Sequence, residues 1–263
     1  MKAAFYQFEP VFGEIKNNVD NFIVKTAGYR ADLIVLPELF STGYQFISKA
    51  EAAELAEEIP SGYTTRRLIE LSKAKSVYIV AGIAERHGLN IYNSAVLTGP
   101  EGFMGVYRKT HLFFEEKLWF TPGDTGFRVW ETRIGRIGIM ICFDWFFPEA
   151  ARTLALRGAD IIAHPANLVL PFCPEGMITR CLENRVFAIT ANRIGTEQRG
   201  GKPPLTYIGS SEIVSPAGKV LYRASQDREE LGAAVINPEE ARNKKLNPFN
   251  DLFADRREDF YKG

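Results

Sequence analysis

The 263-residue chain has no net charge, no long apolar run and no paired cysteines. Its 32 Lys and Arg residues balance 32 Asp and Glu residues without a block of like charge, so we expect neither a nucleic acid nor a membrane as partner. No stretch approaches the roughly 20 apolar residues of a membrane span. The opening MKAAFYQFEP meets Gln7 and Glu9 too soon for a secretory signal. These absences predict a cytoplasmic protein.

Cysteine is scarce and scattered. Cys142, Cys173 and Cys181 form no CxxC pair, which argues against a disulfide framework or a zinc knuckle and fits a reducing compartment. The glycine-rich patterns of nucleotide-binding loops do not occur either. We therefore expect no metal and no cofactor, and each thiol needs its own explanation.

Short apolar strands alternate with amphipathic helical stretches, and no linker or repeat interrupts them. We expect strands at 3–8, 31–38, 77–85, 92–99, 102–109, 136–142, 159–167, 187–194, 210–224 (a hairpin turning at 216–218) and 232–237. We expect helices at 15–27, 63–75, from Pro148 onward and around 175–187. The alternation predicts a single α/β domain over residues 1–263, with two layered sheets and helices outside them.

Three of the apolar strands stop at a chemically active side chain. LIVLPELFSTGY contains Glu38, GVYRKTHLFFEEKLWFTPGD contains Lys109 and Glu116, and IGIMICFDWFFPEAAR contains Cys142. Ligands bind at the carboxyl ends of strands in layered α/β folds, so a carboxylate, an ammonium and a thiol could meet in one pocket. Spacing alone leaves that convergence open.

The three segments, in this order and with YRKTHLF, FTPGD and CFDWFFPEAAR intact, resemble the nitrilase superfamily of carbon-nitrogen hydrolases. The resemblance covers the whole chain and looks closest to archaeal-type nitrilases and aliphatic amidases. It implies a four-layer αββα sandwich, in which helices flank two central mixed sheets. It also implies a homodimer, or a multiple of one, that pairs through the helices PEAARTLALRG and EGMITRCLENRVF. A C-terminal extension, about residues 245–263, is expected to pack on the partner subunit.

The resemblance implies a Glu-Lys-Cys triad. A free thiol has a pKa of ~8.5 and needs a base near neutral pH, so Cys142 would attack while Glu38 takes its proton. Lys109 and the backbone N–H of Phe143 would hold the oxyanion, and a thioester would form as ammonia or an amine leaves. Glu116 stands where the family often has a second glutamate that orients the lysine or the substrate. The adjacent Glu115 could exchange roles with it.

Other interpretations of these residues stay open. His111 or His164 could serve Cys142 in a Cys-His hydrolase with Asn167 as the orienting residue. Cys173 and Cys181 have no such companions and are expected to be structural. The triad could also transfer its acyl group to an amine instead of water, and the fold could carry a binding protein without catalysis, although every triad residue is present.

The substrate is the least defined feature. We expect Tyr44, Phe146 and Asn167 in the substrate pocket, with the largely apolar segments 115–120 and 167–172 as walls. Apolar walls favour small neutral aliphatic amides or nitriles. N-carbamoyl amino acids or amines are the alternative, and a carboxylate-bearing substrate would need a cation such as Arg180 or Arg193.

Overall fold

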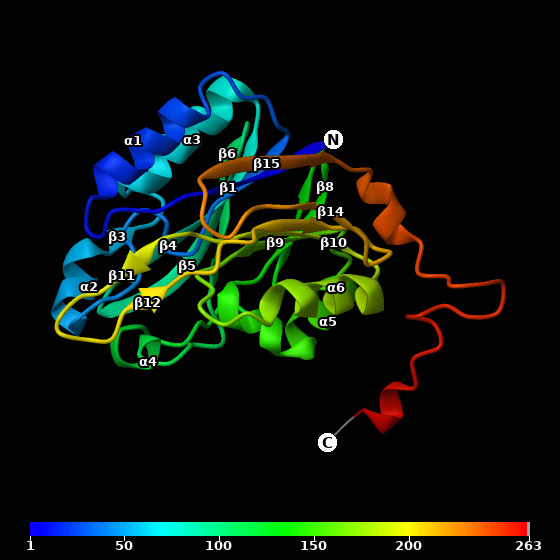
Figure 1. Ribbon diagram of the computed structural model, residues 1–263. Helices are drawn as coiled ribbons and strands as arrows, with labels where there is room; N and C mark the ends of the chain where they lie inside the picture. The colour runs from blue at the N-terminus through cyan, green and yellow to red at the C-terminus, as the bar shows by residue number, and fades with distance from the viewer. Residues whose placement is uncertain (262–263) are drawn as a thin grey trace.

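The computed structural model describes residues 1–261 and consists of two mixed β-sheets between two layers of helices (Figure 1). The first sheet has the strand order β15-β1-β2-β4-β5-β6, and β3 pairs with β4. Its strands are β1 Lys2–Gln7, β2 Leu33–Val35, β3 Glu57–Glu58, β4 Tyr78–His87, β5 Asn90–Gly99, β6 Gly102–Arg108 and β15 Glu230–Val235. Strands β1, β2 and β4 are parallel, whereas β4, β5 and β6 are joined as antiparallel hairpins.

The second sheet has the order β14-β13-β10-β9-β8-β7. Its strands are β7 Val129–Thr132, β8 Gly135–Ile139, β9 Ile161–Pro165, β10 Phe187–Ala191, β13 Glu212–Val214 and β14 Val220–Arg223. Strands β8, β9 and β10 are parallel, so each sheet has three parallel strands at its centre. A separate two-stranded ribbon pairs β11 Thr196–Glu197 with β12 Leu205–Thr206.

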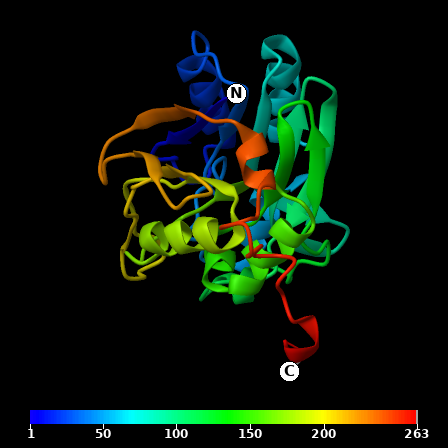
Figure 2. The same cartoon turned by 90° about the vertical axis from the view of Figure 1, so that its right-hand side faces the viewer.

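Helices cover both outer faces (Figures 1 and 2). On the first sheet lie α1 Ile15–Lys25 and α3 Tyr63–Lys75, and on the second lie α5 Pro148–Leu156 and α6 Cys173–Asn184. The shorter helices are α2 Lys49–Leu55 and α4 Glu116–Trp119, with 3₁₀ turns η1 Cys142–Phe146, η2 Pro238–Arg242 and η3 Glu258–Phe260. Among residues 1–261, no helix is long and apolar enough to cross a membrane.

The burial pattern explains the layers. Phe5 and Val35 of the first sheet share one buried cluster with Ile139 and Ile189 of the second, because their strands face each other across the centre. On the outer face of the first sheet, Phe22 of α1 packs in a second cluster with alternate strand residues. The central strands β1, β2, β9 and β10 therefore bury both of their faces, as expected for the middle layers of a sandwich. The predicted αββα architecture is confirmed.

Several strands are shorter than predicted. The strand expected over 31–38 is only Leu33–Val35, because Pro37 has no N–H for the ladder and Leu39 turns the chain with φ +49°. The strand expected to reach Cys142 ends at Ile139, three residues before the turn. The sequence pattern did not predict α2, α4, β3, β7 or the β11–β12 ribbon, which are short or lack clear periodicity.

Beyond η2 the chain runs away from the sandwich (Figures 1 and 2). Phe253 packs back against the second sheet's side, where the guanidinium of Arg152 lies 5.3 Å from its ring centre. Phe249 is 91% exposed and Phe260 is 72% exposed. Large exposed aromatic side chains suit a protein contact. Packing of this extension on a partner subunit stays a prediction.

Candidate active site

The ends of four strands converge at one edge of the sandwich. Glu38 follows β2, Lys109 follows β6, Cys142 follows β8 and Asn167 follows β9. Strand β6 runs in the same direction as β2 because two antiparallel pairings separate it from β4. Asn167 Nδ2 donates to the backbone oxygen of Glu38 over 2.8 Å, which ties the second sheet to the first at this edge.

A buried cluster of polar side chains lies there. Lys109 Nζ donates to Glu38 Oε1 over 2.6 Å and to Glu116 Oε1 over 2.7 Å. Asn93 Nδ2 also donates to Glu38 Oε1, over 2.7 Å, and the Tyr44 hydroxyl donates to Glu116 Oε1 over 2.7 Å. Because both carboxylates are almost fully buried, the ammonium between them offsets their desolvation.

Burial sets the protonation of this cluster. Desolvation raises the pKa of Glu38 to about 7, against the lowering effect of the Lys109 charge. Desolvation by itself would lower the pKa of Lys109, but the charges of Glu116 and Glu38 raise it on balance, so it remains an ammonium. Burial and the Glu38 charge raise the pKa of the Cys142 thiol well above its usual value. The resting thiol therefore keeps its proton and needs a base.

Cys142 occupies a strained turn. Its φ is +41°, in the left-handed region that non-glycine residues rarely adopt, and the 3₁₀ turn η1 begins at this residue. The first N–H groups of such a turn, including that of Phe143, have no partner within it. The thiol therefore stands at the start of a turn whose first backbone donors have no partner within it.

Asp144 secures this turn. One carboxylate oxygen accepts from the Ile141 N–H over 2.9 Å and from the Tyr107 hydroxyl over 2.7 Å. The other accepts from the His111 N–H over 3.1 Å and contacts the His111 ring Nδ1 at 2.8 Å. The side chain therefore joins the residue before Cys142 to the segment that follows Lys109.

The Lys109 segment is also clamped from the FTPGD loop. Gly123 N–H donates to the backbone oxygen of Lys109 over 2.9 Å. A Cβ at Gly123 would lie 2.1 Å from the backbone oxygen of Arg108, so only glycine fits there. Arg108 itself pairs with Glu85 at 2.7 Å and with Asp124 at 2.9 Å. The motif thus holds the backbone that carries the lysine.

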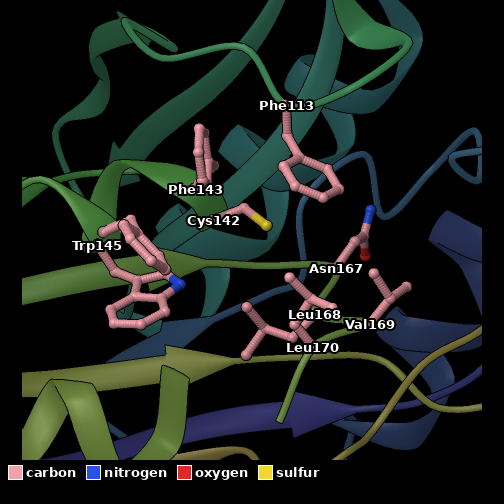
Figure 3. A pocket seen from close by; sticks show the side chains of 9 residues that line it. Phe113, Cys142, Phe143, Trp145, Asn167, Leu168, Val169 and Leu170 are labelled. Carbon is pink, nitrogen blue, oxygen red and sulfur yellow. The ribbon is translucent and has the colours of Figure 1, made fainter. Parts of the chain in front are cut away.

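A hollow opens beside Cys142 and encloses about 350 Å³, part of it open to solvent. Figure 3 shows the sulfur pointing into the space between Phe113 and Asn167. The walls are otherwise aromatic and aliphatic, made by Phe113, Phe143, Trp145, Phe146, Leu168, Val169 and Leu170. Among residues 1–261, no Asp, Glu, Lys or Arg lines this hollow, so it suits a small, uncharged ligand.

The structure brings together the four residues predicted to be catalytic. Glu38, Lys109 and Glu116 are in direct contact, and the charges of all three act on the Cys142 thiol. It also distinguishes Glu116 from its neighbour, since Glu116 pairs with Lys109 whereas Glu115 pairs with Lys202 at 2.7 Å. Their catalytic roles stay predictions.

Only some of the residues predicted for the substrate pocket line this hollow. Phe146 and Asn167 line the hollow, but Tyr44 does not, because its hydroxyl is held by Glu116. Residues 167–170 of the predicted wall 167–172 line this hollow, whereas segment 115–120 does not. Glu115, Glu116 and Trp119 line a second hollow together with Tyr44, so a role of that segment as a substrate wall stays a prediction. That segment forms the short helix α4, and its Glu116 instead turns toward Lys109.

Neither candidate arginine reaches the hollow. Arg180 donates to the backbone oxygen of Trp145 and pairs with Glu183. Arg193 is buried in an ion pair with Glu197. Both guanidinium groups are therefore already paired elsewhere, which leaves no cation for a substrate carboxylate among the lining residues of the described chain.

His164 and His111 make hydrogen bonds to groups other than the Cys142 thiol. His164 Nε2 lies 3.0 Å from the backbone oxygen of Cys142, and its Nδ1 lies 3.1 Å from Thr190 Oγ1. Burial lowers the pKa of His164 to about 4, so the ring is neutral. His111 contacts Asp144. The geometry thus disfavours the Cys-His alternative.

Two contributors to the site were missed in the sequence. Asn93 lies within the apolar strand β5, where nothing in the pattern distinguishes it from a buried structural amide. Asp144 could have been noticed, because an acid among the aromatic residues of CFDWFF must find buried donors.

Comparison with known proteins agrees with this geometry. The family described as carbon-nitrogen hydrolase matches residues 2–245. The chain is 51% identical to a nitrilase from Pyrococcus abyssi over 99% of both chains, and 34% identical to an (R)-stereoselective amidase from Pseudomonas sp over 86% of this chain and 82% of that one. The crystal structure of a carbon-nitrogen hydrolase from Helicobacter pylori G27 superposes with a TM-score of 0.88 at 28% identity, covering 99% of this chain and 96% of that one. The chain therefore belongs to the carbon-nitrogen hydrolase family of the nitrilase superfamily and is an enzyme of that class.

Proposed function

We propose that this enzyme hydrolyses small, neutral aliphatic amides or nitriles to the carboxylic acid and ammonia, with Cys142 as nucleophile. The contact that supports this best is the buried pairing of Lys109 with Glu38 and Glu116 beside a protonated thiol. Lys109 and Asn93 both donate to Glu38 Oε1. Oε2 has no hydrogen-bond partner among residues 1–261, so it is available as a base.

In the first half of the reaction with an amide, the Cys142 sulfur forms a bond to the carbonyl carbon and its proton passes to Glu38. Two of the three N–H groups of Lys109 are held by carboxylates, which leaves one for the oxyanion. The Phe143 N–H supplies the second donor. The C–N bond then breaks, and the nitrogen leaves as ammonia with the proton from Glu38.

In the second half, Glu38 takes a proton from water, whose oxygen bonds to the thioester carbon. The C–S bond breaks and the thiol regains the proton, so one water is consumed for each amide. With a nitrile, the thiol first adds across the triple bond, and one further water releases ammonia from the thioimidate. Both substrates converge on the same thioester.

The apolar hollow favours an uncharged acyl group. Its lining side chains are aromatic or aliphatic apart from Cys142 and Asn167. A carboxylate or ammonium on the substrate would be desolvated there without a partner, which is costly. N-carbamoyl amino acids and amines are therefore the less favoured alternative.

The proposal is tested by ammonia release from a panel of aliphatic amides, nitriles and carbamoyl compounds. Wild-type enzyme should act on neutral members, and Cys142→Ala and Glu38→Gln should each abolish turnover while the circular dichroism spectrum is unchanged. Repeating the assay with an added amine separates hydrolysis from acyl transfer, because a transferase would form the substituted amide. Preference for the charged carbamoyl compounds would contradict the assignment.

We also propose a homodimer that pairs through α5 and α6, with the 245–263 extension crossing to the partner. Leu156 of α5 and Leu182 of α6 are 42% and 48% exposed, which supports an apolar contact on this face. Sedimentation at micromolar concentration tests the proposal. A species of about 30 kDa alone, close to the chain mass of 29.5 kDa, would contradict it.

A further inference from the structure

We propose that this site selects amides over nitriles, and that the side-chain oxygen of Asn167 is the acceptor that distinguishes them. The inference rests on the proposed function, since both compounds would be attacked by the same thiol. It goes further by naming one of the two substrate classes and the residue that recognises it.

The first observation is a pair of buried acceptors that lack a donor. Glu38 Oε2 and Asn167 Oδ1 are both inaccessible and have no hydrogen-bond partner in the described chain. Asn167 is only 4% exposed. Asn93, which donates to Glu38, has a third such acceptor in its Oδ1. Buried acceptors are nearly always paired in proteins, so these orphans at one site point to a ligand that brings donors.

The orientation of the Asn167 amide is fixed by its other end. Its Nδ2 donates to the backbone oxygen of Glu38 over 2.8 Å. Turning the amide over would set its oxygen against that carbonyl oxygen, which is repulsive. The unpaired atom is therefore an oxygen, which can only accept.

The second observation is the position of Asn167 beside the nucleophile. Its backbone N–H partly offsets the rise that burial and the Glu38 charge impose on the pKa of the Cys142 thiol. Both residues line the same hollow, and the sulfur points toward Asn167 (Figure 3). A carbon attacked by this sulfur therefore carries its nitrogen into the neighbourhood of the two orphan acceptors.

A primary amide matches these acceptors and a nitrile does not. The amide nitrogen carries two N–H groups, one for Glu38 Oε2 and one for Asn167 Oδ1. The nitrile nitrogen carries no hydrogen and would bury both oxygens unpaired. Sites that hydrogen-bond a substrate group discriminate strongly against analogues that lack it, so we expect kcat/KM to favour the amide by on the order of 10²–10⁴.

The test compares propionamide with propionitrile, which share one acyl group, by ammonia release from the full-length enzyme. The wild-type ratio of kcat/KM values should exceed about 100 in favour of the amide. Asn167→Leu removes the acceptor, so this ratio should fall at least tenfold, even if both activities drop because the contact to Glu38 is also lost. Asn167→Asp keeps an oxygen acceptor at this position and should retain the ratio.

Asn192→Ala is the matched control. Asn192 Oδ1 accepts from the Leu168 N–H over 2.8 Å, so this variant loosens the same segment without altering the two acceptors. Its amide-to-nitrile ratio should equal that of the wild type. A fall as large as in Asn167→Leu would make the effect structural and overturn the assignment of Asn167.

The outcomes separate the inference from the proposed function. Comparable kcat/KM values for the two compounds in the wild type, or a preference for the nitrile, would overturn the selectivity while leaving the hydrolase assignment intact. Turnover of neither compound, together with activity on charged carbamoyl substrates, would refute both. The wild-type ratio decides the selectivity itself even if a variant fails to fold.

Discussion

Replacing Asp144 with Asn should lower both the stability of the fold and kcat, and the size of each effect can be estimated from the contacts of Asp144. Three donors point at the carboxylate (the Ile141 N–H, the His111 N–H and the Tyr107 hydroxyl), and the His111 ring nitrogen completes the shell. The hydroxyl and the ring can each reverse their role, but a backbone N–H cannot. An Asn side chain must therefore leave one buried N–H unsatisfied, whichever way it faces.

One unsatisfied buried donor costs roughly 1–3 kcal/mol. For a chain of this size each kcal/mol lowers the melting temperature by about 2–4 °C, so we expect a decrease of about 2–12 °C by scanning calorimetry. The freed N–H belongs either to Ile141, next to the nucleophile, or to His111, two residues after Lys109. A displacement of about 1 Å there can cost about 100-fold, so kcat should fall by roughly 10- to 100-fold.

The assay is ammonia release together with the melting curve, and Asp124→Asn serves as the control. Asp124 also pairs with a neighbour of Lys109, but its side chain is 58% exposed, so both readouts should change little. If Asp144→Asn matches wild type in kcat and in melting temperature, the view that Asp144 couples the two segments is refuted.

Three further predictions follow from the buried cluster and the chain end. The value of kcat/KM should rise as the pH passes through about 7, because Glu38 loses its proton and becomes a base. The stability that protonated Glu38 contributes should be complete below its ordinary pKa of 4.5 and should be lost as the pH rises through about 7. Profiles of kcat/KM and of melting temperature that show no transition near pH 7 would contradict this. Lys109→Met should lower kcat by about 10²–10³ and also destabilise the fold, because two buried carboxylates lose their cation. Single-turnover kinetics measures the first effect and calorimetry the second, and the absence of either would contradict the prediction. Deleting residues 245–263 should raise the dimer dissociation constant measured by sedimentation. At protein concentrations high enough to keep the enzyme dimeric, kcat should stay unchanged.

Much of the fold could be predicted because its pattern is local. Strands such as β4 and β5 are long apolar runs with a turn between them, and α3 has apolar residues at helical spacing. The short elements could not be predicted, since α4 and β11 are stabilised by contacts with distant residues. Glu197 in β11, for example, accepts from the backbone of Tyr44 and Gln45.

The residues of the site could be predicted from the sequence, but the hydrogen bonds and ion pairs between them could not. Glu38, Lys109 and Cys142 stand out as reactive groups at strand ends, and the resemblance supplied their order. Which of Glu115 and Glu116 faces the lysine depends on one turn of α4, which places adjacent residues on different sides. The roles of Asn93 and Asp144 depend on partners 55 and 33 residues away, which no local pattern contains.

Some predictions depend on surroundings that a single chain does not contain. The cytoplasmic location, the dimer and the partner contact of the extension all concern other molecules or compartments. They stay predictions, and the sedimentation experiments address two of them directly.

Acylation of Cys142 is measured most directly by intact and peptide mass spectrometry of wild-type enzyme quenched during turnover of an aliphatic amide. We predict an acyl adduct on the peptide that contains Cys142, absent in Cys142→Ala and removed in wild type by alkaline hydroxylamine, as expected for a thioester. Cys173 and Cys181 are not among the residues that line the hollow, so they should remain unmodified. An adduct on either of these residues, or steady turnover by Cys142→Ala, would contradict the account.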